Sequence, residues 1–171
     1  MSAMRVFGLA GWSGSGKTTL VTRLIPELAR RGLRVSTVKH AHHAFDVDTP
    51  GKDSYEHRRA GATEVLVSSA NRFALMHELR GAPEPTLAEL LARLAPVDLV
   101  LVEGFKRHAH DKLEVHRPSV GKPLLAPDDP HIVAVASDAA LSGLKVPVLA
   151  LDDVAAIADL VMARAKPAEA A

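Results

Sequence analysis

The sequence is marked first by what it lacks. It has no cysteine, which excludes disulfide bonds and metal sites built on thiolate ligands. It has no excess of one charge, since the formal net charge is +1, so it lacks the basic field typical of nucleic-acid-binding domains. No apolar run approaches the ~20 residues that cross a bilayer. The N-terminal segment also lacks the basic leader and long apolar run of a signal peptide. These absences predict a cytoplasmic protein with no membrane and no nucleic-acid partner.

The composition is that of an ordinary globular protein. The chain has 171 residues, of which 47% are apolar and 24% are charged. That length and apolar content suffice to bury a sizeable core and argue against global disorder. We expect residues 1–165 to form a single nucleotide-binding domain, and the small, polar residues 166–171 to be a disordered tail.

The N-terminal part alternates between strand and helix patterns. Residues 5–10 are mostly apolar, as in a strand buried on both faces. Residues 18–31 have helical apolar spacing, with Pro26 inside the pattern and Gly32 placed to end it. We expect Pro26 to bend or break this helix. Residues 34–39 are expected to form a second strand, which completes the strand, loop, helix and strand of a parallel sheet.

The rest of the chain continues the alternation. The patterns predict helices at 54–60 and 87–94, with a third that starts after Asp152 or Asp153 and ends near residue 165. Residues 63–69 and 72–79 predict a hairpin. Further strands are expected at 99–102, 112–117, 131–138 and 146–153, with 112–117 as a short outer strand. The predicted fold class is α/β, a three-layer P-loop NTPase domain with a mainly parallel sheet and one antiparallel hairpin excursion.

A phosphate-binding motif lies between the first strand and the first helix. Gly11, Gly16, Lys17 and Thr18 match G-x-x-x-x-G-K-[ST]. Glycines allow successive backbone N–H groups to turn toward an anion, and the following helix adds its positive dipole end. Lys17 is suited to the β- and γ-phosphates, and the Thr18 hydroxyl to Mg²⁺. The alternative is a Gly/Ser turn with an exposed lysine. Trp12 either shields this site or packs under the loop.

A second magnesium ligand is expected at Glu103. It ends the apolar run 99–103, and ligand sites lie at the carboxyl ends of parallel strands. Asp98 stands at the opposite end of the same strand and is not expected at the site. The alternative for Glu103 is a solvated carboxylate at a strand end.

The polar segment after the second strand holds further candidates. Asp46 and Asp48 alternate, so an extended backbone would point both carboxylates one way. We assign Asp48 a catalytic part alongside Lys17, holding a magnesium-bound or attacking water. A solvated acidic turn is the alternative. His40, His42 and His43 lie close together, but their spacing matches no closed zinc site, which favours a polar surface over a metal site.

Several segments together resemble one family. GWSGSGKTTL, VKHAHHAFDVDTPGKDSYEHRRAGA, RFALM, LVLVEGFK and VASD occur in the order expected of the MobB family, the molybdopterin-guanine dinucleotide biosynthesis adapter proteins. The resemblance extends from about residue 5 to the final helix. The phosphate loop is common to many families, whereas the long His/Asp segment and VEGFK are specific to this one.

The resemblance implies a function and a set of site residues. It implies a GTP-binding protein with weak hydrolysis, a homodimer, and a partner nucleotidyltransferase, the molybdenum cofactor guanylyltransferase, that joins GMP to molybdopterin. Molybdopterin or its guanine dinucleotide is then a second ligand. It places Mg²⁺ on Thr18 and Glu103, and the guanine base at Asp138, which follows VAS instead of an Asn-Lys-x motif. The phosphate-binding residues it implies are Gly11, Trp12, Ser13, Gly14, Ser15, Gly16, Lys17, Thr18 and Thr19. A helix or turn cap is the alternative for Asp138.

Two other functions remain open from the residues alone. One is a metal-delivering GTPase that carries nickel or zinc on its histidine segment. The other is a small-molecule kinase, for which the basic segment 55–59 would serve as a lid. Arg58 and Arg59 are also the candidates for a cation that assists hydrolysis.

Overall fold

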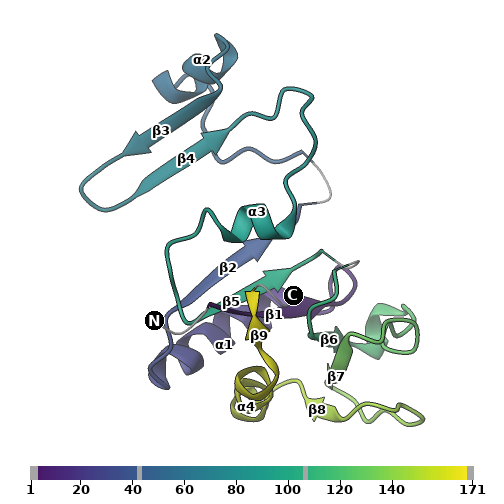
Figure 1. The fold of residues 1–171 in the computed structure, drawn as a ribbon. Helices are drawn as coiled ribbons and strands as arrows, with labels where there is room; N and C mark the ends of the chain where they lie inside the picture. Colours follow the sequence, from purple (N-terminus) through teal and green to yellow (C-terminus); the bar gives the residue numbers. More distant parts are fainter. Residues whose placement is uncertain (1–3, 42–43, 106–107, 169–171) are drawn as a thin grey trace. The chain divides into compact units, whose positions relative to one another are not determined.

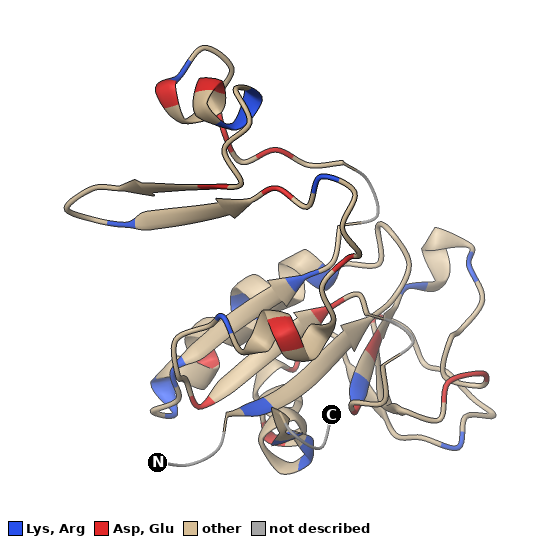
Figure 2. Ribbon diagram, turned by 45° about the horizontal axis from the view of Figure 1, so that its top comes forward, with Lys and Arg blue, Asp and Glu red and all other residues tan. Residues whose placement is uncertain are grey.

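The computed structural model describes residues 4–41, 44–105 and 108–168 (Figure 1). Its contacts divide the chain into two compact units. The main unit comprises Met1–His40 and Leu87–Ala171, and the inserted unit comprises Ala41–Thr86. The sequence had suggested a single domain over residues 1–165. Figure 2 shows acidic and basic residues interspersed over both units.

The main unit is built on a parallel sheet. In spatial order its strands are β2 (Val35–Lys39), β5 (Leu99–Glu103), β1 (Arg5–Ala10), β6 (Lys112–His116), β7 (Ile132–Ser137) and β8 (Val148–Ala150). Each neighbouring pair in this order is parallel. The carboxyl ends of all six strands therefore meet at one edge of the sheet, and the loops that follow them share that edge.

One strand prediction was wrong in its position. Residues 112–117 were expected as an outer strand, whereas β6 lies between β1 and β7 and is buried along its whole length. The polar residues Lys112, Glu114 and His116 misled the prediction. Their side chains are buried, and the Glu114 carboxylate accepts hydrogen bonds from the backbone N–H groups of Leu125 and Ala126 in the following loop, both at 2.8 Å.

Helices cover both faces of this sheet, as Figure 1 shows. The helices α1 (Lys17–Arg30) and α4 (Val154–Arg164) bury leucines and smaller aliphatic residues against one face. The short helix α3 (Leu87–Leu91) covers the other face and packs on Val6, Val100 and Val102. The predicted three-layer α/β fold is confirmed. In the part of the chain that the structure describes, no helix is both long and apolar enough to traverse a bilayer.

The helix ends follow from local sequence. Gly32 adopts φ +86° and ends α1. Its N–H donates a hydrogen bond to the Ala29 carbonyl, and the N–H of Leu33 donates one to the Leu28 carbonyl. Asp153 accepts a hydrogen bond from the N–H of Ala156 and begins α4. The break predicted at Pro26 does not occur, since α1 runs through it. Pro26 is exposed, so the carbonyl that loses its donor faces solvent.

The end of the chain is tied to the sheet. Lys166–Pro167 form β9, which pairs antiparallel with the first residues of β1. Asp111 anchors this segment, because its buried carboxylate accepts hydrogen bonds from Arg164 at 3.0 Å and from Lys166 at 2.8 Å. Residues 166 and 167, assigned to the tail from the sequence, therefore carry regular structure.

The inserted unit contains a helix and a hairpin. The elements are α2 (Asp53–Arg59), β3 (Glu64–Ser68) and β4 (Phe73–His77), and β3 pairs antiparallel with β4. The hairpin predicted for residues 63–79 is confirmed, and its pairs set Leu66 opposite Leu75. In the described part of this unit, Val65 is the only buried apolar side chain.

Candidate nucleotide-binding site

The glycine-rich loop stands where the motif requires it. Residues 11–16 connect the carboxyl end of β1 to α1, whose first residue is Lys17. The free N–H groups of the first turn of α1 therefore face the same edge as the loop. Because β1 is a central strand, the loop is flanked by the ends of β5 and β6.

Two glycines allow the backbone to follow this path. Gly11 has φ +143°, and a Cβ added there would lie 2.5 Å from the Val115 carbonyl oxygen, closer than real Cβ contacts come. Gly16 has φ +101° and caps the N-terminus of α1. A side chain at Gly11 would be strained and would displace β6, and one at Gly16 would be strained. The loop thus requires glycine for both conformation and space.

The lysine of the motif lies against its own loop. The Lys17 ammonium donates hydrogen bonds to the carbonyl oxygens of Gly11 at 2.8 Å and Trp12 at 2.9 Å. Ser13, Gly14, Thr18 and Thr19 are exposed, whereas Ser15 is buried. The Lys17 ammonium therefore lies next to the exposed residues of the loop, and a phosphate-binding site requires such an arrangement.

Trp12 packs outward from the loop onto the segment after β6. Its indole N–H donates a hydrogen bond to the Pro123 carbonyl at 2.8 Å. The Lys122 ammonium lies 5.8 Å from the centre of the indole ring, within cation–π range. These contacts make the segment after β6 a wall beside the phosphate loop, a role that the sequence left undecided.

Glu103 lies at the predicted edge. It is the last residue of β5, it pairs with Leu9 of β1, and its side chain is about one-fifth exposed. The Lys39 ammonium is 3.9 Å from its carboxylate. Asp98 is at the opposite end of β5, where it binds the backbone N–H and guanidinium of Arg34. The placement of both acids agrees with the sequence analysis, and the magnesium role of Glu103 and Thr18 stays a prediction.

Asp138 follows β7 at the same edge and has a basic partner. The Arg117 guanidinium donates one hydrogen bond to an Asp138 carboxylate oxygen at 3.0 Å and another to the Ser15 carbonyl of the phosphate loop at 3.1 Å. Arg117 thus joins the predicted base-binding acid to the predicted phosphate site. The sequence analysis missed it. Its position at the end of the expected strand 112–117 was the only available signal.

Asp46 and Asp48 belong to the inserted unit, where they share one partner. Asp46 accepts hydrogen bonds from Nη2 of Arg58 at 3.0 and 2.9 Å, and Asp48 accepts one from Nε at 3.1 Å. Nη1 of Arg58 binds Glu78 at 2.9 Å. Both aspartates therefore do point one way, toward a cation. Arg58 is engaged by three carboxylates, and the catalytic role of Asp48 stays a prediction.

These contacts keep the carboxylates charged. The hydrogen bonds from Arg58, followed by that from the Asp48 backbone, lower the pKa of the Asp46 carboxyl below its ordinary 3.8. Burial works against ionisation of Asp48, but hydrogen bonds from Ser54, Thr49 and Arg58 outweigh it and lower its pKa as well. The pKa of Arg58 is raised, chiefly by Asp46 and Glu78.

The histidine segment falls partly outside the described residues, which exclude His42 and His43. The His40 ring packs on Phe105 with 5.1 Å between ring centroids. Within residues 4–41, 44–105 and 108–168, no group of three or more His, Asp or Glu side chains is arranged to hold a metal ion.

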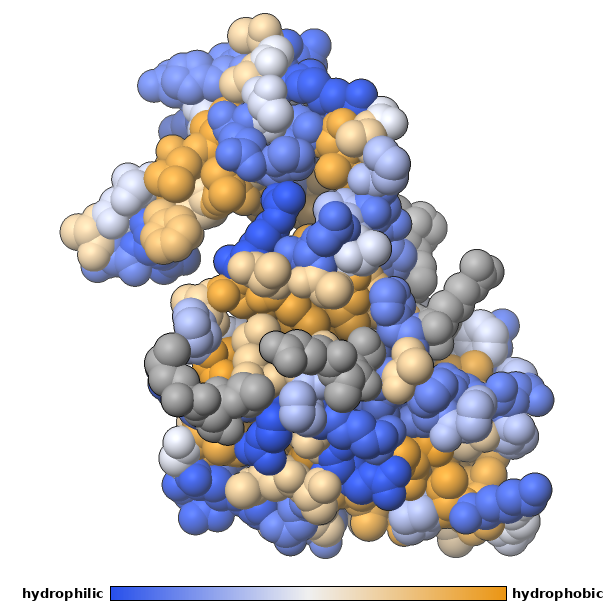
Figure 3. All heavy atoms as spheres, in the orientation of Figure 1, coloured by the Kyte–Doolittle hydropathy of each residue, from blue (hydrophilic) through white to orange (hydrophobic). Residues whose placement is uncertain are grey.

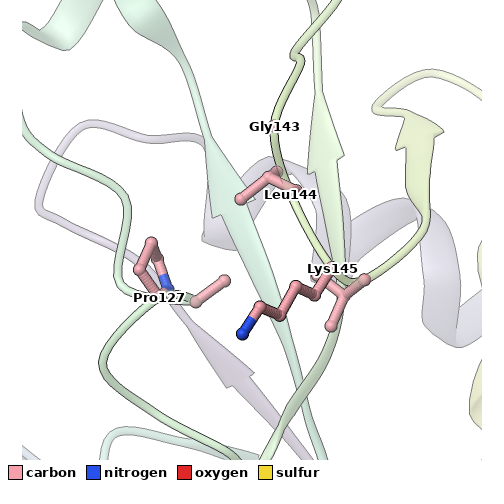
Figure 4. Close-up of a pocket in the computed structure, with 6 residues that line it drawn as sticks. Pro127, Gly143, Leu144 and Lys145 are labelled. Carbon is pink, nitrogen blue, oxygen red and sulfur yellow. The ribbon is translucent and has the colours of Figure 1, made fainter.

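A pocket elsewhere in the main unit is separate from the loop. It has a volume of about 220 Å³ and is lined by Ala126, Pro127 and residues 143–146 (Figure 4). The lining segments precede β7 and β8, so they belong to the amino-terminal ends of these strands. Ligand sites of parallel sheets lie at the other edge, so this pocket is not the candidate nucleotide site.

Comparisons with known proteins agree with this fold and loop. The family model for molybdopterin guanine dinucleotide synthesis protein B matches residues 6–138. The molybdopterin-guanine dinucleotide biosynthesis adapter protein of Escherichia coli (strain K12) is 46% identical over 160 residues, which are 92% of this chain and 91% of that protein. The protein of the same description from Haemophilus influenzae is 43% identical over 136 residues, which are 78% of this chain and 74% of that one.

The fold is shared with a solved structure as well. A crystal structure of molybdopterin-guanine biosynthesis protein B superposes with a TM-score of 0.71 at 28% identity, and the match covers 92% of this chain and 98% of that one. The glycine-rich loop, Glu103 and Asp138 all lie within the matched residues 6–138. The chain belongs to the family of molybdopterin guanine dinucleotide synthesis protein B (MobB).

Proposed function

We propose that this chain is a GTP-binding adapter in molybdopterin guanine dinucleotide biosynthesis. In this proposal it assists the nucleotidyltransferase that attaches GMP to molybdopterin, and it hydrolyses GTP slowly. Family membership supports the pathway. The observation that carries the nucleotide part is the loop after β1, with Lys17 bound to the Gly11 and Trp12 carbonyls above it.

The loop residues bind the phosphates in this proposal. Backbone N–H groups of residues 13–18 and the dipole of α1 attract phosphate oxygens. The Lys17 ammonium already lies on the loop, so it exchanges two carbonyl contacts for contacts with charged oxygens. The carbonyls are neutral dipoles whereas the phosphate oxygens carry negative charge, so the ammonium is attracted more strongly to the phosphates and this exchange favours the bound state.

The residues expected at a magnesium site suit that ion. Thr18 is exposed at the start of α1, and Glu103 ends the strand beside β1, so both supply oxygen ligands at one edge. Magnesium takes oxygen ligands and usually keeps several waters, so two protein ligands suffice. When bound, it would neutralise charge on the phosphate oxygens.

The contacts of Arg58 in the inserted unit support the proposal that hydrolysis is slow. Arg58, a candidate for an assisting cation, is held by Asp46, Asp48 and Glu78. The lowered pKa of Asp48 keeps it ionised, so it is suited to orient a water by accepting a hydrogen bond and poorly suited to remove its proton. We therefore propose that Asp48 positions water and that Lys17 stabilises charge on the phosphates.

Asp138 is proposed to select guanine. A carboxylate accepts hydrogen bonds from the N1–H and N2–H₂ groups of guanine, and adenine does not present that pair of donors. The position of Asp138 after β7, at the edge that carries the phosphate loop, supports this assignment.

A homodimer is proposed through the hairpin of the inserted unit. Leu66, Phe73 and Leu75 alternate onto one face of β3 and β4, and they are 60%, 71% and 49% exposed. Figure 3 shows apolar side chains gathered on this hairpin. A lone two-stranded hairpin is marginal in water, so a second copy that covers this face would stabilise it. Molybdopterin or its guanine dinucleotide and the guanylyltransferase are the further partners, in the cytoplasm.

The direct test is Lys17→Ala. We expect GTP affinity measured by calorimetry to fall by about 100-fold or more, because an ammonium that contacts the phosphates is removed. The thermal unfolding midpoint should change little, since Lys17 is partly exposed. The variant should also lose any stimulation of GMP attachment by the guanylyltransferase.

The matched control is Lys145→Ala, an exposed lysine at the opposite edge of the sheet. It should bind GTP like the parent. GTP binding by Lys17→Ala at parental affinity would refute the nucleotide assignment.

A further inference from the structure

Arg117 and Asp138 are brought together by the register of two strands. Arg117 follows the last residue of β6, and Asp138 follows the last residue of β7. His116 and Ser137 are paired across the parallel ladder, so the two residues that follow leave the sheet side by side. Both therefore stand at the edge that carries the phosphate loop.

The guanidinium uses different atoms for its two partners. Its Nε–H donates to the Ser15 carbonyl at 3.1 Å, and Nη1 donates to Oδ2 of Asp138 at 3.0 Å. In the described part of the chain, Oδ1 of Asp138 has no hydrogen-bond donor. One carboxylate oxygen is thus fixed from the side of the phosphate loop, and the other is left to accept from a ligand.

The backbone of the loop accommodates this arginine. A Cβ added at Gly16 would lie 3.1 Å from Nε and 3.4 Å from Nη2 of Arg117. Gly16 is also the residue that caps α1, directly before Lys17. The planar guanidinium therefore rests on the backbone where the phosphate loop becomes a helix. A lysine lacks this fork and cannot make both contacts with the same geometry.

Fold stability does not account for this arrangement. Arg117 and Asp138 side chains are 36% and 39% exposed, and ion pairs this exposed contribute little to stability. What the contact does provide is orientation. A surface carboxylate rotates freely, whereas recognition of two adjacent donors requires its plane to be held.

We infer that Arg117 is a positioning residue that sets the base preference of the nucleotide site. It holds the Asp138 carboxylate in a fixed orientation relative to the phosphate loop, so that a purine bound through its phosphates meets the carboxylate with N1–H and N2–H₂. This inference rests on the proposed GTP-binding function. The new element is that guanine selectivity depends on Arg117, which follows the strand next to the one that Asp138 follows.

The test compares three ligands in the full-length protein. GTP carries both donors, ITP lacks the N2 amino group, and tripolyphosphate probes the phosphate loop alone. We expect the parent to prefer GTP over ITP by about tenfold or more, tenfold being the low end for one hydrogen bond to a charged group. In Arg117→Lys, which keeps the charge, the ratio of the affinity for GTP to that for ITP should fall to a value between about 1 and about 3. The affinity for tripolyphosphate should stay nearly unchanged.

Two further variants complete the design. Arg34→Lys alters a similar Arg–Asp pair at the opposite edge of the sheet and should leave all three affinities unchanged. Asp138→Ala should remove the preference for GTP over ITP, and adding Arg117→Lys to it should remove nothing further, because the two residues act together.

The outcomes separate this inference from the function on which it rests. If the parent binds neither GTP nor tripolyphosphate, the proposed function fails. If the parent binds GTP but does not distinguish it from ITP, or if Arg117→Lys keeps the parental ratio, only the inference is overturned. An equal loss of GTP, ITP and tripolyphosphate binding in Arg117→Lys would also overturn it, since Arg117 would then serve the phosphates alone.

Discussion

The two units of this chain are stabilised in different ways. The main unit buries aliphatic side chains on both faces of its sheet, with Leu24, Leu28 and Val100 fully inaccessible. The inserted unit has Val65 as its buried apolar side chain within the described residues, and it exposes Leu66 and Phe73. Instead of an apolar core it has a cluster of ion pairs, in which Arg58 contacts Asp46, Asp48 and Glu78.

This difference follows from secondary structure. A parallel sheet needs crossover helices, which cover its faces and create an apolar core. A hairpin with a seven-residue helix cannot enclose such a core, so specific polar contacts define its conformation. The main unit therefore suits a rigid ligand site, and the inserted unit suits contact with a partner that covers its apolar face.

The largest expected effect is on the polar cluster of the inserted unit. In Arg58→Ala, Asp46, Asp48 and Glu78 lose their common cation, and the nearly inaccessible Asp48 carboxylate is left without its charged partner. Hydrogen exchange measured on the full-length protein should accelerate in α2, β3 and β4. The sheet of the main unit should keep its protection.

Arg59→Ala is the matched control for this variant. Arg59 is exposed, and within the described residues its guanidinium contacts the ring and the hydroxyl of Tyr55. It should leave exchange of the inserted unit nearly unchanged. Equal exchange in Arg58→Ala and the parent would show that the cluster does not stabilise this unit.

The second effect concerns pH and the main unit. Burial, together with the nearby Lys112 ammonium, lowers the pKa of His110 from 6.5 to about 4. Between these values the unfolded chain binds a proton that the folded chain does not, so stability falls as pH drops from about 6.5 to about 4. At pH 5 the loss amounts to about 2 kcal/mol. The carboxylates of the inserted unit, with pKa values below 3.8, add no such loss in that range.

Urea unfolding at pH 7 and pH 5 measures this effect. His110→Leu should lose most of the difference between the two pH values, because it removes the titrating ring. No hydrogen bond is lost with it, since both ring nitrogens of His110 are buried without a hydrogen-bond partner. His57→Leu, at an exposed position, should retain the parental difference. The same pH dependence in His110→Leu and the parent would contradict the assignment.

The smallest effect on stability is expected on the apolar hairpin. Leu66→Ser with Phe73→Ser changes two exposed side chains, so the stability of the monomer should shift by less than about 0.5 kcal/mol per site. Sedimentation should nevertheless show a change from dimer to monomer. A parent that is already monomeric, or a variant that stays dimeric, would remove the hairpin as the dimer contact.

Much of the fold could be predicted from the sequence because the periodicities are strong. The strand before the phosphate loop, the helix with Leu20, Leu24 and Leu28, and the hairpin all lie where predicted. The glycine-rich loop was placed correctly because its motif is local and lies within eight residues, and its phosphate-binding role stays a prediction. Glu103 was placed correctly because the end of an apolar run indicates the end of a buried strand.

The errors have physical causes as well. Residues 112–117 suggested an edge because Lys112 and Glu114 are charged, yet Lys112 finds a partner in the segment before β6 and Glu114 in the loop after it. Pro26 suggested a break, and the exposed side of the helix tolerates it. Arg117 was overlooked because its partners, Ser15 and Asp138, are 102 and 21 residues away in sequence.

The helices, the strands and the position of the glycine-rich loop could be predicted from the sequence alone, since each depends on residues that are neighbours along the chain. The tertiary structure decided the order of the strands, the division into two units and the partners of Arg117 and Arg58. Those features depend on which distant segments meet, and burial and hydrogen bonding across the fold select that arrangement.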